Sequence, residues 1–152
     1  MKKMKITIGC DHGGRRLKDA IVAHLNTRGV LVSDIGTYSD DSVDFPSYAE
    51  EVANQVNSGE ADLGILCCGT GIGMSIAANK VTGIRAAVVS DCFSAQATRE
   101  HNDSNILCLG ERVVGEGLAL RIVDTWLDTK FGGERHTHRL QMITAIELKN
   151  ET

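Results

Sequence analysis

The sequence predicts an α/β protein built on a parallel β-sheet with helices on both faces. Strand-like and helix-like segments alternate from one end of the chain to the other. The strand-like segments are almost continuously apolar, as buried parallel strands are. The length of 152 residues, of which 42% are apolar and 24% charged, fits one soluble globular domain.

The spacing of apolar residues changes between the first predicted strand and the first predicted helix. Residues 4–9 (MKITIG) alternate and carry β-branched side chains, which favours a strand. A helical pattern follows over residues 15–27, and Arg28-Gly29 ends it. Residues 30–36 (VLVSDIG) then predict a second strand.

The second helix opens at the only proline of the chain. Pro46 suits the first turn of a helix, and this helix is expected to run to about Asn57, where Ser58-Gly59 stops it. Residues 63–68 (LGILCC) predict a buried strand. The following GIGMSIAANK leads from a loop into a helix.

The last third of the chain continues the alternation. The expected elements are a strand at 84–90, a helix at 92–101, a fifth strand at 105–110, an amphipathic helix at 116–128 and, after Gly132-Gly133, a final helix at 134–149.

Composition and charge limit the classes of ligand and the cellular compartment that the protein could have. A net charge of −4 argues against nucleic-acid binding, which needs a broad basic face. With one Trp, two Tyr and three Phe, few rings can stack on bases, so a small polar ligand is expected. The odd count of five cysteines fits reduced intracellular thiols. The N-terminal apolar stretch is too short for a signal peptide and no segment is long enough to span a membrane, which predicts a cytoplasmic protein.

Open α/β sheets bind ligands beyond the carboxyl ends of their strands. This rule selects four segments, at residues 9–14 (GCDHGG), 67–73 (CCGTGIG), 90–92 (SDC) and 109–115 (LGERVVG). In the second of them, glycines between a strand and a helix bring backbone N–H groups close to a ligand, and the helix start favours negative charge. The loop matches neither the dinucleotide fingerprint nor the P-loop, so it predicts an anion cradle of another kind.

Cys68 lies at the end of the buried strand, just before this cradle. The positive charge of a helix start favours a thiolate, which makes Cys68 a candidate base or nucleophile. The alternative is a small buried hydrophobic side chain. Strand alternation directs Cys67 to the opposite face, where that alternative suits it.

Three groups of polar residues lie elsewhere in the chain. Arg135 and Arg139, one turn apart at a helix start, repel each other unless an anion lies between them; the alternative is a solvated face balanced by Glu134. His136 and His138 diverge too far on a helix to chelate one ion, so no metal is expected. Two further pairs, Asp11-His12 and His101-Asn102, flank strands and suggest acid–base chemistry, although a lone histidine is more often structural.

Together these segments resemble a known family. The stretches GCDHGG, CGTGIGMSIAANK, GIRAA, SAQATREHNDSNILCLGERVVG and RHTHR are similar to those of the type-B ribose-5-phosphate isomerases. The wider family includes the galactose-6-phosphate isomerase subunits. The resemblance covers about residues 5–147, with the motifs in the family's order and spacing.

The resemblance implies a Rossmann-like three-layer αβα sandwich with a five-stranded parallel sheet and an extra C-terminal helix. It implies a single sugar-phosphate isomerase domain over residues 1–152, whose helix 134–149 packs on a partner subunit. It also implies a homodimer or homotetramer with shared active sites, no metal and no organic cofactor, and neither nucleic acid nor membrane as a partner.

The resemblance also implies an aldose–ketose isomerase that works through a cis-enediolate, with ribose 5-phosphate as the expected sugar. Cys68 matches the base that moves the proton between C2 and C1. The groups matched to the anion hole are Thr70 and the backbone amides of Gly69, Gly71 and Gly73. His101, with Asp11, matches the groups that help to open the furanose ring, and Asn102 matches a substrate-binding position. The phosphate clamp is matched by His12, Arg112, Arg135 and Arg139, with His136 as a companion.

Some positions depart from the family pattern. Some relatives use a glutamate later in the glycine loop as the base, but IGMSIA contains no acid, which leaves Cys68. Phe45 stands where relatives often carry tyrosine, and Cys67 replaces a more usual aliphatic residue. A hexose 6-phosphate or tetrulose 4-phosphate therefore stays open as the substrate. A non-catalytic phosphate- or nucleotide-binding module and a thiol redox protein built on Cys67-Cys68 are the alternatives from other classes.

Overall fold

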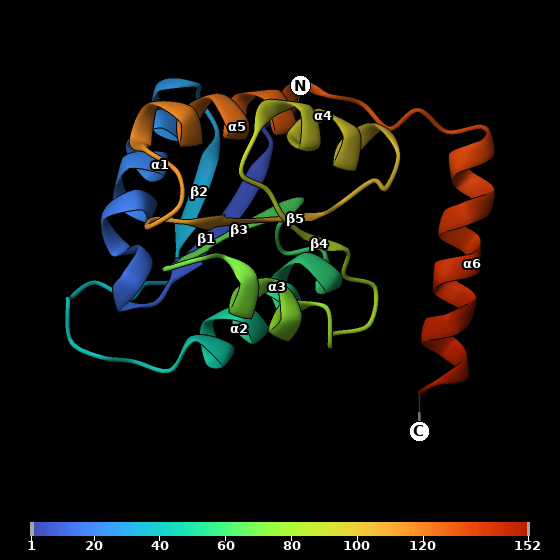
Figure 1. Ribbon diagram of the computed structural model, residues 1–152, viewed down its shortest axis with the longest axis horizontal. Helices are drawn as coiled ribbons and strands as arrows, with labels where there is room; N and C mark the ends of the chain where they lie inside the picture. The colour runs from blue at the N-terminus through green and yellow to red at the C-terminus, as the bar shows by residue number, and fades with distance from the viewer. Residues whose placement is uncertain (1, 152) are drawn as a thin grey trace.

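The computed structural model describes residues 2–151 as one five-stranded parallel sheet between two layers of helices (Figure 1). The strand order is β2-β1-β3-β5-β4. The strands are β1 (Lys5–Cys10), β2 (Leu31–Asp34), β3 (Leu63–Cys68), β4 (Ala86–Val88) and β5 (Ile106–Gly110). The expected three-layer α/β fold is confirmed.

The helices divide between the two faces of the sheet. They are α1 (Arg15–Thr27), α2 (Phe45–Ser58), α3 (Ile72–Ala78), α4 (Cys92–Glu100), α5 (Glu116–Asp128) and α6 (Arg135–Lys149), with a short 3-10 helix η1 (His12–Gly14). One face is covered by α1, α4 and α5 and the other by α2 and α3, which pack on each other (Figure 1).

Each face has its own apolar core. Trp126 is fully buried on the α5 side, where its indole N–H donates to the Ser104 hydroxyl at 2.9 Å. Met74 fills the core on the α3 side. Cys67 belongs to the first core and Cys68 to the second, as strand alternation predicts.

Element bounds follow the sequence patterns closely, except in the two edge strands. The strand expected at 30–36 is reduced to β2, Leu31–Asp34. The helices expected at 15–27 and 116–128 begin and end at those residues. The strand expected at 84–90 is reduced to three residues, Ala86–Val88. This strand is an edge strand that pairs only with β5, so it lacks a second neighbour to extend its ladder.

The C-terminal helix α6 stands apart from the sandwich, on the side of the molecule away from α1 (Figure 1). None of its residues is buried. Its far end is fastened to the loop before β4, where Gly83 N–H donates to Glu147 at 3.1 Å and the Thr82 hydroxyl donates to Glu151 at 2.6 Å. Across residues 2–151, every helix is too short or too polar to cross a bilayer.

Candidate active site

The central strands β1 and β3 end side by side, and the chain turns away from them in opposite directions. Cys10 is level with Cys67 across this pair, and the chain leaves β1 for β2 on one side and β3 for the β4–β5 side on the other. Such a divergence opens a crevice beyond the strand ends. Asp11 N–H donates to the Cys67 carbonyl at 3.2 Å and Glu111 N–H to the Cys68 carbonyl at 2.9 Å, so both neighbouring loops are fixed to the end of β3.

The sulfur of Cys68 lies under the turn that starts α3. It accepts the N–H of Gly71 at 3.0 Å, and the residue is only 6% exposed. Gly71 has φ of +81°, in the left-handed region, and a Cβ there would lie 3.0 Å from the Leu109 carbonyl carbon. Glycine is therefore needed for this close approach. The contact stabilises negative charge on the sulfur, as a thiolate base requires.

The thiols of the other three strand cysteines are held protonated by burial. The Cys10 thiol donates to the Thr37 carbonyl at 3.6 Å, and burial raises its pKa to about 12. Burial also raises the pKa of Cys67 and of Cys108, with neighbouring thiols adding to the shift. These three sulfurs remain neutral thiols at neutral pH. Cys68 is the strand cysteine whose sulfur accepts a backbone N–H within the described chain.

A backbone donor, a hydroxyl and an aromatic ring lie around the start of α3. Gly73 lies in the first turn of α3, where N–H groups have no partner within the helix. Thr70 is exposed, and its hydroxyl accepts the Ile72 N–H at 3.2 Å. The ring of Phe45 lies over Gly73, where a Cβ would come within 2.8 Å of it.

Asp11 and His12 form the opposite wall. Asp11 is 9% exposed, and its carboxylate accepts the Gly13 N–H at 2.9 Å, which caps η1. His12 Nδ1 accepts the N–H of Val43 at 3.1 Å. Because that nitrogen is an acceptor, the neutral ring carries its proton on Nε2 and presents a donor.

The loop over His12 is held by a buried lysine. Lys18 Nζ donates to both carboxylate oxygens of Asp34 at 2.9 Å and to the Thr37 carbonyl at 3.0 Å. Burial opposes the charge of Lys18, but the hydrogen bond to Asp34 and the negative charges of Asp34 and Asp19 act together against it, and the pKa of Lys18 is raised. The bridge fastens the start of the loop whose far end supplies the Val43 N–H to His12.

Arg112 completes this half of the site. Its N–H donates to the Gly69 carbonyl at 3.0 Å, and its guanidinium lies 3.3 Å from where a Cβ of Gly69 would be. Glu111 accepts the Leu17 N–H at 2.9 Å in the first turn of α1, so the Arg112 loop is tied to that helix. We call Asp11, His12, Cys68, the loop 69–73 and Arg112 the thiol edge.

The remaining candidate residues gather at the opposite end of the sheet. His101 follows α4, and its ring stacks on His136 of α6 with centroids 4.6 Å apart and planes 17° apart. Gly132 N–H donates to the Glu100 carbonyl at 2.9 Å and brings the start of α6 beside α4. Burial, with the positive charges of Arg135 and Arg139 and the neighbouring His101, lowers the pKa of His136. We call His101, Asn102, Arg135, His136 and Arg139 the histidine edge.

Two arginines of the histidine edge are free to bind an anion. Arg135 and Arg139 are exposed, and none of the ion pairs formed within residues 2–151 includes either of them. Neither Glu134 nor another acidic side chain forms an ion pair with them in this range. The arrangement suits a doubly charged group such as a phosphate.

The two edges do not meet within one chain. Cys68 is level with Gly110, at the end of β5, whereas Asn102 precedes the start of that strand. The strand alone spans roughly 13 Å, at about 3.3 Å per residue. A residue that follows a helix and precedes a parallel strand lies at the amino edge, so the sequence contained this signal for His101.

Two contributors to the thiol edge were missed at the sequence level. Glu111 lies in a segment already selected as a strand-end loop, but its cap on α1 depends on a contact between residues far apart in the chain. Val43 acts through its backbone, for which no side-chain pattern exists.

Two further observations concern possible metal-ligand clusters and disulfides. Over the described range 2–151, no three His, Cys, Asp or Glu side chains gather as metal ligands would. The five cysteines are all free.

Comparison with known proteins places the chain among sugar isomerases. The family model described as Ribose/Galactose Isomerase matches residues 6–143. The chain is 57% identical over 143 residues to "Ribose-5-phosphate isomerase B" of Escherichia coli K12, covering 94% of this chain and 96% of that protein. It is 43% identical over 128 residues to "Galactose-6-phosphate isomerase subunit LacB" of Clostridium acetobutylicum, covering 84% and 74%. The solved structure of Clostridium thermocellum ribose-5-phosphate isomerase B matches with a TM-score of 0.96 at 57% identity, covering 97% of this chain and all of that one.

Proposed function

The chain belongs to the ribose/galactose isomerase family, an aldose–ketose isomerase family, and on that premise we propose that it interconverts ribose 5-phosphate and ribulose 5-phosphate with Cys68 as the base. The observation that carries the proposal is the Cys68 sulfur, which accepts the Gly71 N–H at the crevice between β1 and β3. The identities to named ribose-5-phosphate isomerases support the choice of ribose.

The proposed chemistry moves one proton between neighbouring carbons. The Cys68 thiolate takes the proton from C2 of the open-chain aldose, and the C–H electrons form the C1–C2 double bond as the aldehyde oxygen becomes an enediolate oxyanion. The thiol then returns the proton to C1 and becomes the thiolate again, while the C2 hydroxyl proton passes to the oxyanion on C1, which leaves a ketone at C2 and a hydroxyl on C1. A positioned base contributes about 10²–10⁴-fold to such a step.

The cradle would stabilise the charge that develops on the enediolate. The Gly73 N–H, which lies in the first turn of α3 and has no partner within that helix, and the exposed Thr70 hydroxyl are the groups proposed to bind that oxygen. A single preorganised donor of this kind commonly contributes about 3–4 kcal/mol to transition-state stabilisation. The glycines at positions 69, 71 and 73 allow the sugar to approach the backbone.

The histidine edge would come from a second copy of the chain. His101 and Asp11 are proposed to open the furanose ring together, yet they lie at opposite ends of the sheet within one chain. A dimer that sets the histidine edge of one copy over the thiol edge of the other would bring them together. His12 and Arg112 would then bind the phosphate with Arg135, Arg139 and His136 of the other copy, and Asn102 would bind the sugar.

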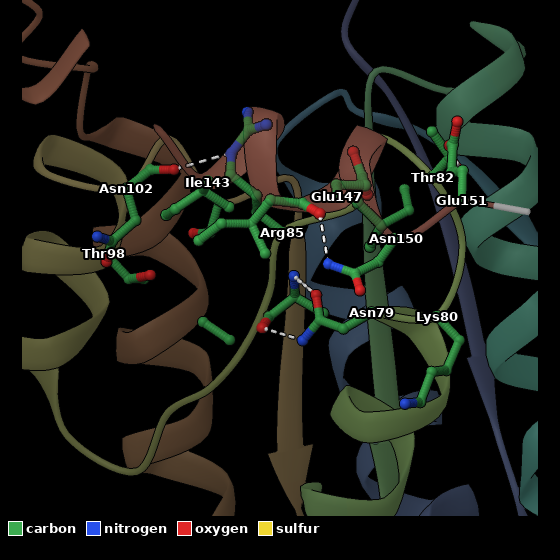
Figure 2. Close-up of a pocket in the computed structure, with 15 residues that line it drawn as sticks. Asn79, Lys80, Thr82, Arg85, Thr98, Asn102, Ile143, Glu147, Asn150 and Glu151 are labelled. Atoms are coloured by element: carbon green, nitrogen blue, oxygen red, sulfur yellow. Dashed lines mark hydrogen bonds between the residues drawn. The ribbon is translucent and has the colours of Figure 1, made fainter. Parts of the chain in front are cut away.

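The surface of α6 supports this assembly. Met142 is 56% and Ile146 63% exposed, which a monomeric helix would not favour. A groove of about 750 Å³ separates α6 from the edge strand β4, with Ile143 and Asn150 on one wall and Asn79 on the other (Figure 2). Exposed apolar side chains beside an open groove are typical of a surface that packs on another subunit.

The base is tested by substituting the two adjacent cysteines. We expect Cys68→Ala to lower kcat for ribose 5-phosphate by about 10³-fold or more, because no other base replaces the thiolate. Cys67→Ala, the matched control, should keep most of the activity, since Cys67 lies in the other core. Wash-in of solvent deuterium into the sugar at an unchanged rate in Cys68→Ala would rule out the cysteine base.

The sugar is tested with a panel of aldose phosphates. The values of kcat/KM are compared for ribose 5-phosphate, galactose 6-phosphate, allose 6-phosphate and a tetrose 4-phosphate. We expect ribose 5-phosphate to lead. A preference of about tenfold or more for another sugar would replace ribose as the substrate and leave the isomerase chemistry intact.

Shared sites are tested by mixing two inactive variants. Cys68→Ala and His101→Asn are denatured together and refolded in equal amounts. If each site combines the two edges of different chains, mixed dimers regain one intact site, and the mixture recovers about one quarter of wild-type activity. A mixture no more active than its parents would show that each site uses a single chain.

A further inference from the structure

The turn between α4 and β5 presents His101 and Asn102 at the histidine edge. Its apex, Asp103, has φ of +45°, in the left-handed region. Asp is one of the few residues with a Cβ that adopt this conformation at single positions, because its short polar side chain can bond locally. Contacts from the rest of the chain add to the stability of the turn.

Arg85, from the GIRAA segment, reaches across the turn and binds its backbone. Its Nε donates to the Asn102 carbonyl at 2.9 Å, a contact visible in Figure 2, and its Nη2 donates to the Asp103 carbonyl at 2.9 Å. The side chain of Asp103 lies 3.5 Å from the same Nη2. Arg85 thus binds the two residues at and beside the left-handed position.

The backbone of Arg85 is itself fixed to the far end of the same turn. Its N–H donates to the Asn105 side-chain oxygen at 2.8 Å, and its carbonyl accepts the Asn105 N–H at 3.0 Å. Asn105 also donates to the Gly83 carbonyl at 2.9 Å. The backbone of Arg85 is therefore held in place one residue before β4. From this position its guanidinium bridges the turn.

A second arginine holds the turn from the helix side. Arg99 Nη1 donates to the Ser104 carbonyl at 2.5 Å and to the Asp103 carboxylate at 3.2 Å, and its guanidinium packs over the ring of Trp126. Between them the two arginines satisfy the carbonyls of Asn102, Asp103 and Ser104.

We propose that Arg85 is a positioning residue for sugar-ring opening, because it fixes the turn that presents His101 and Asn102 to the substrate. The inference rests on the proposed function, in which His101 acts on the furanose ring. A guanidinium can bind two successive carbonyls in a fixed fork, which the single ammonium of lysine cannot do.

The two sugars of the reaction separate this role from general damage. Ribose 5-phosphate closes into a furanose and must be opened before its C2 proton is accessible. Ribulose 5-phosphate has no such ring, because the oxygen on C5 that would close it carries the phosphate. Exchange of the C1 hydrogen of ribulose 5-phosphate with solvent therefore needs Cys68 and the cradle but not ring opening.

The kinetic experiment compares Arg85→Met and Arg85→Lys with Arg121→Met, a control on an exposed arginine of α5. For both Arg85 variants we expect kcat/KM for ribose 5-phosphate to fall by about 10- to 100-fold, as a misplaced group does. Deuterium wash-in at saturating ribulose 5-phosphate should stay within about threefold of wild type, and Arg121→Met should match wild type in both assays. An equal loss in both assays, or no loss in either, overturns the proposal.

Two further measurements make the test independent of folding and of the substrate. Arg85→Met/His101→Asn should lose less activity than the product of the two single losses, because part of the Arg85 effect acts through His101; fully additive losses overturn the proposal. Amide hydrogen exchange should accelerate over residues 101–105 in Arg85→Met while β3 stays protected. An unchanged rate over 101–105 also overturns it.

Wild-type protein that fails to isomerise ribose 5-phosphate would overturn the proposed function instead. The hydrogen-exchange data would still decide whether Arg85 holds the turn.

Discussion

The two edges of the sheet are built in opposite ways. At the thiol edge, backbone packs on backbone: a Cβ on Gly14 would lie 2.7 Å from the Cys68 nitrogen, and one on Gly110 would lie 2.6 Å from the Thr70 carbonyl carbon. At the histidine edge the binding groups are exposed side chains, Arg135 and Arg139 among them, on a helix that buries none of its residues.

This difference separates two tasks. A cradle for a developing charge must not relax when the charge appears, so close-packed backbone suits it. A clamp for a charged group that enters and leaves needs long, solvated side chains. Substitutions at the thiol edge should therefore disturb folding and chemistry together, whereas those at the histidine edge should change kinetics alone.

The largest effect is expected at Gly110. In Gly110→Ala the new methyl group meets the main chain of Thr70, which cannot move without displacing the cradle. We expect a loss of about 3 kcal/mol in the free energy of unfolding, at the upper end for overpacking, together with most of the isomerase activity. Urea unfolding and initial rates measure the two quantities.

Gly117→Ala is the matched control for this substitution. Gly117 lies in α5 with open space around it, so alanine there should be neutral or stabilise by up to about 1 kcal/mol. Gly110→Ala protein as stable as wild type would show that the thiol edge can relax and would remove the main difference between the two edges.

The next effect is kinetic and should leave stability unchanged. Arg139→Ala removes an exposed guanidinium from the proposed phosphate clamp. A lost hydrogen bond to a charged group accounts for about 2 kcal/mol, which corresponds to a fall of about 30-fold in kcat/KM for ribose 5-phosphate. The Tm should match that of wild type, because Arg139 has no ion pair within residues 2–151.

Arg121→Ala serves as the control for Arg139→Ala, since it removes the same side chain from another exposed helix position. Sedimentation of both variants checks that the assembly is the same. An unchanged kcat/KM in Arg139→Ala would take this residue out of the clamp.

A smaller effect is expected where the thiol edge is braced against α1. Glu111→Ala removes the acceptor for the Leu17 N–H, and the loss of such a helix cap costs about 1 kcal/mol of stability. Because Glu111 precedes Arg112, kcat/KM should fall several-fold as well, so the variant should combine a loss of stability with a loss of activity. Glu111→Gln keeps an acceptor oxygen and should restore most of both. A stability loss with full activity would mean that Arg112 is held independently of this cap.

The sequence patterns predict local structure well and long-range pairing poorly. Periodicity located α1 and α5 to the residue, because helix ends are determined by near neighbours such as Gly29. The length of β4 was wrong, because it depends on being the edge strand in the order β2-β1-β3-β5-β4. The strand order depends on how the helices pack on the sheet, and a local sequence pattern does not contain that information.

The candidate site shows the same division. The strand-end rule placed the segments at Asp11, Cys68 and Arg112 together, and the structure has all three at one edge. The stacking of His101 on His136 joins helices 34 residues apart through the Gly132 contact, and the hydrogen bond from Val43 to His12 uses only backbone. Neither interaction can be predicted from the types of side chain along the sequence.

The smallest effect lies away from both edges and tests whether stability can change without kinetics. Asp124 on α5 accepts hydrogen bonds from His24 at 2.8 Å and Arg28 at 2.7 Å, which join α5 to the end of α1. Burial opposes ionisation of Asp124, but these hydrogen bonds outweigh it and lower its pKa. Since the folded pKa lies below the unfolded value of about 3.9, the stabilisation is present above that pH and is lost as pH falls through the folded pKa.

Asp124→Asn should therefore destabilise the protein at pH 7 by less than about 1 kcal/mol, a small value because the carboxylate is 38% exposed and screened by solvent. The difference from wild type should shrink below about pH 4, where the native carboxylate also begins to lose its charge. Urea unfolding at pH 7, 5 and 3 measures this, with the unpaired surface residue in Glu50→Gln as the control, and kcat/KM at pH 7 should be unchanged. Equal destabilisation at pH 3 and pH 7 would assign the effect to packing, and a change in kcat/KM would mean that the α1–α5 face communicates with the thiol edge through Glu111.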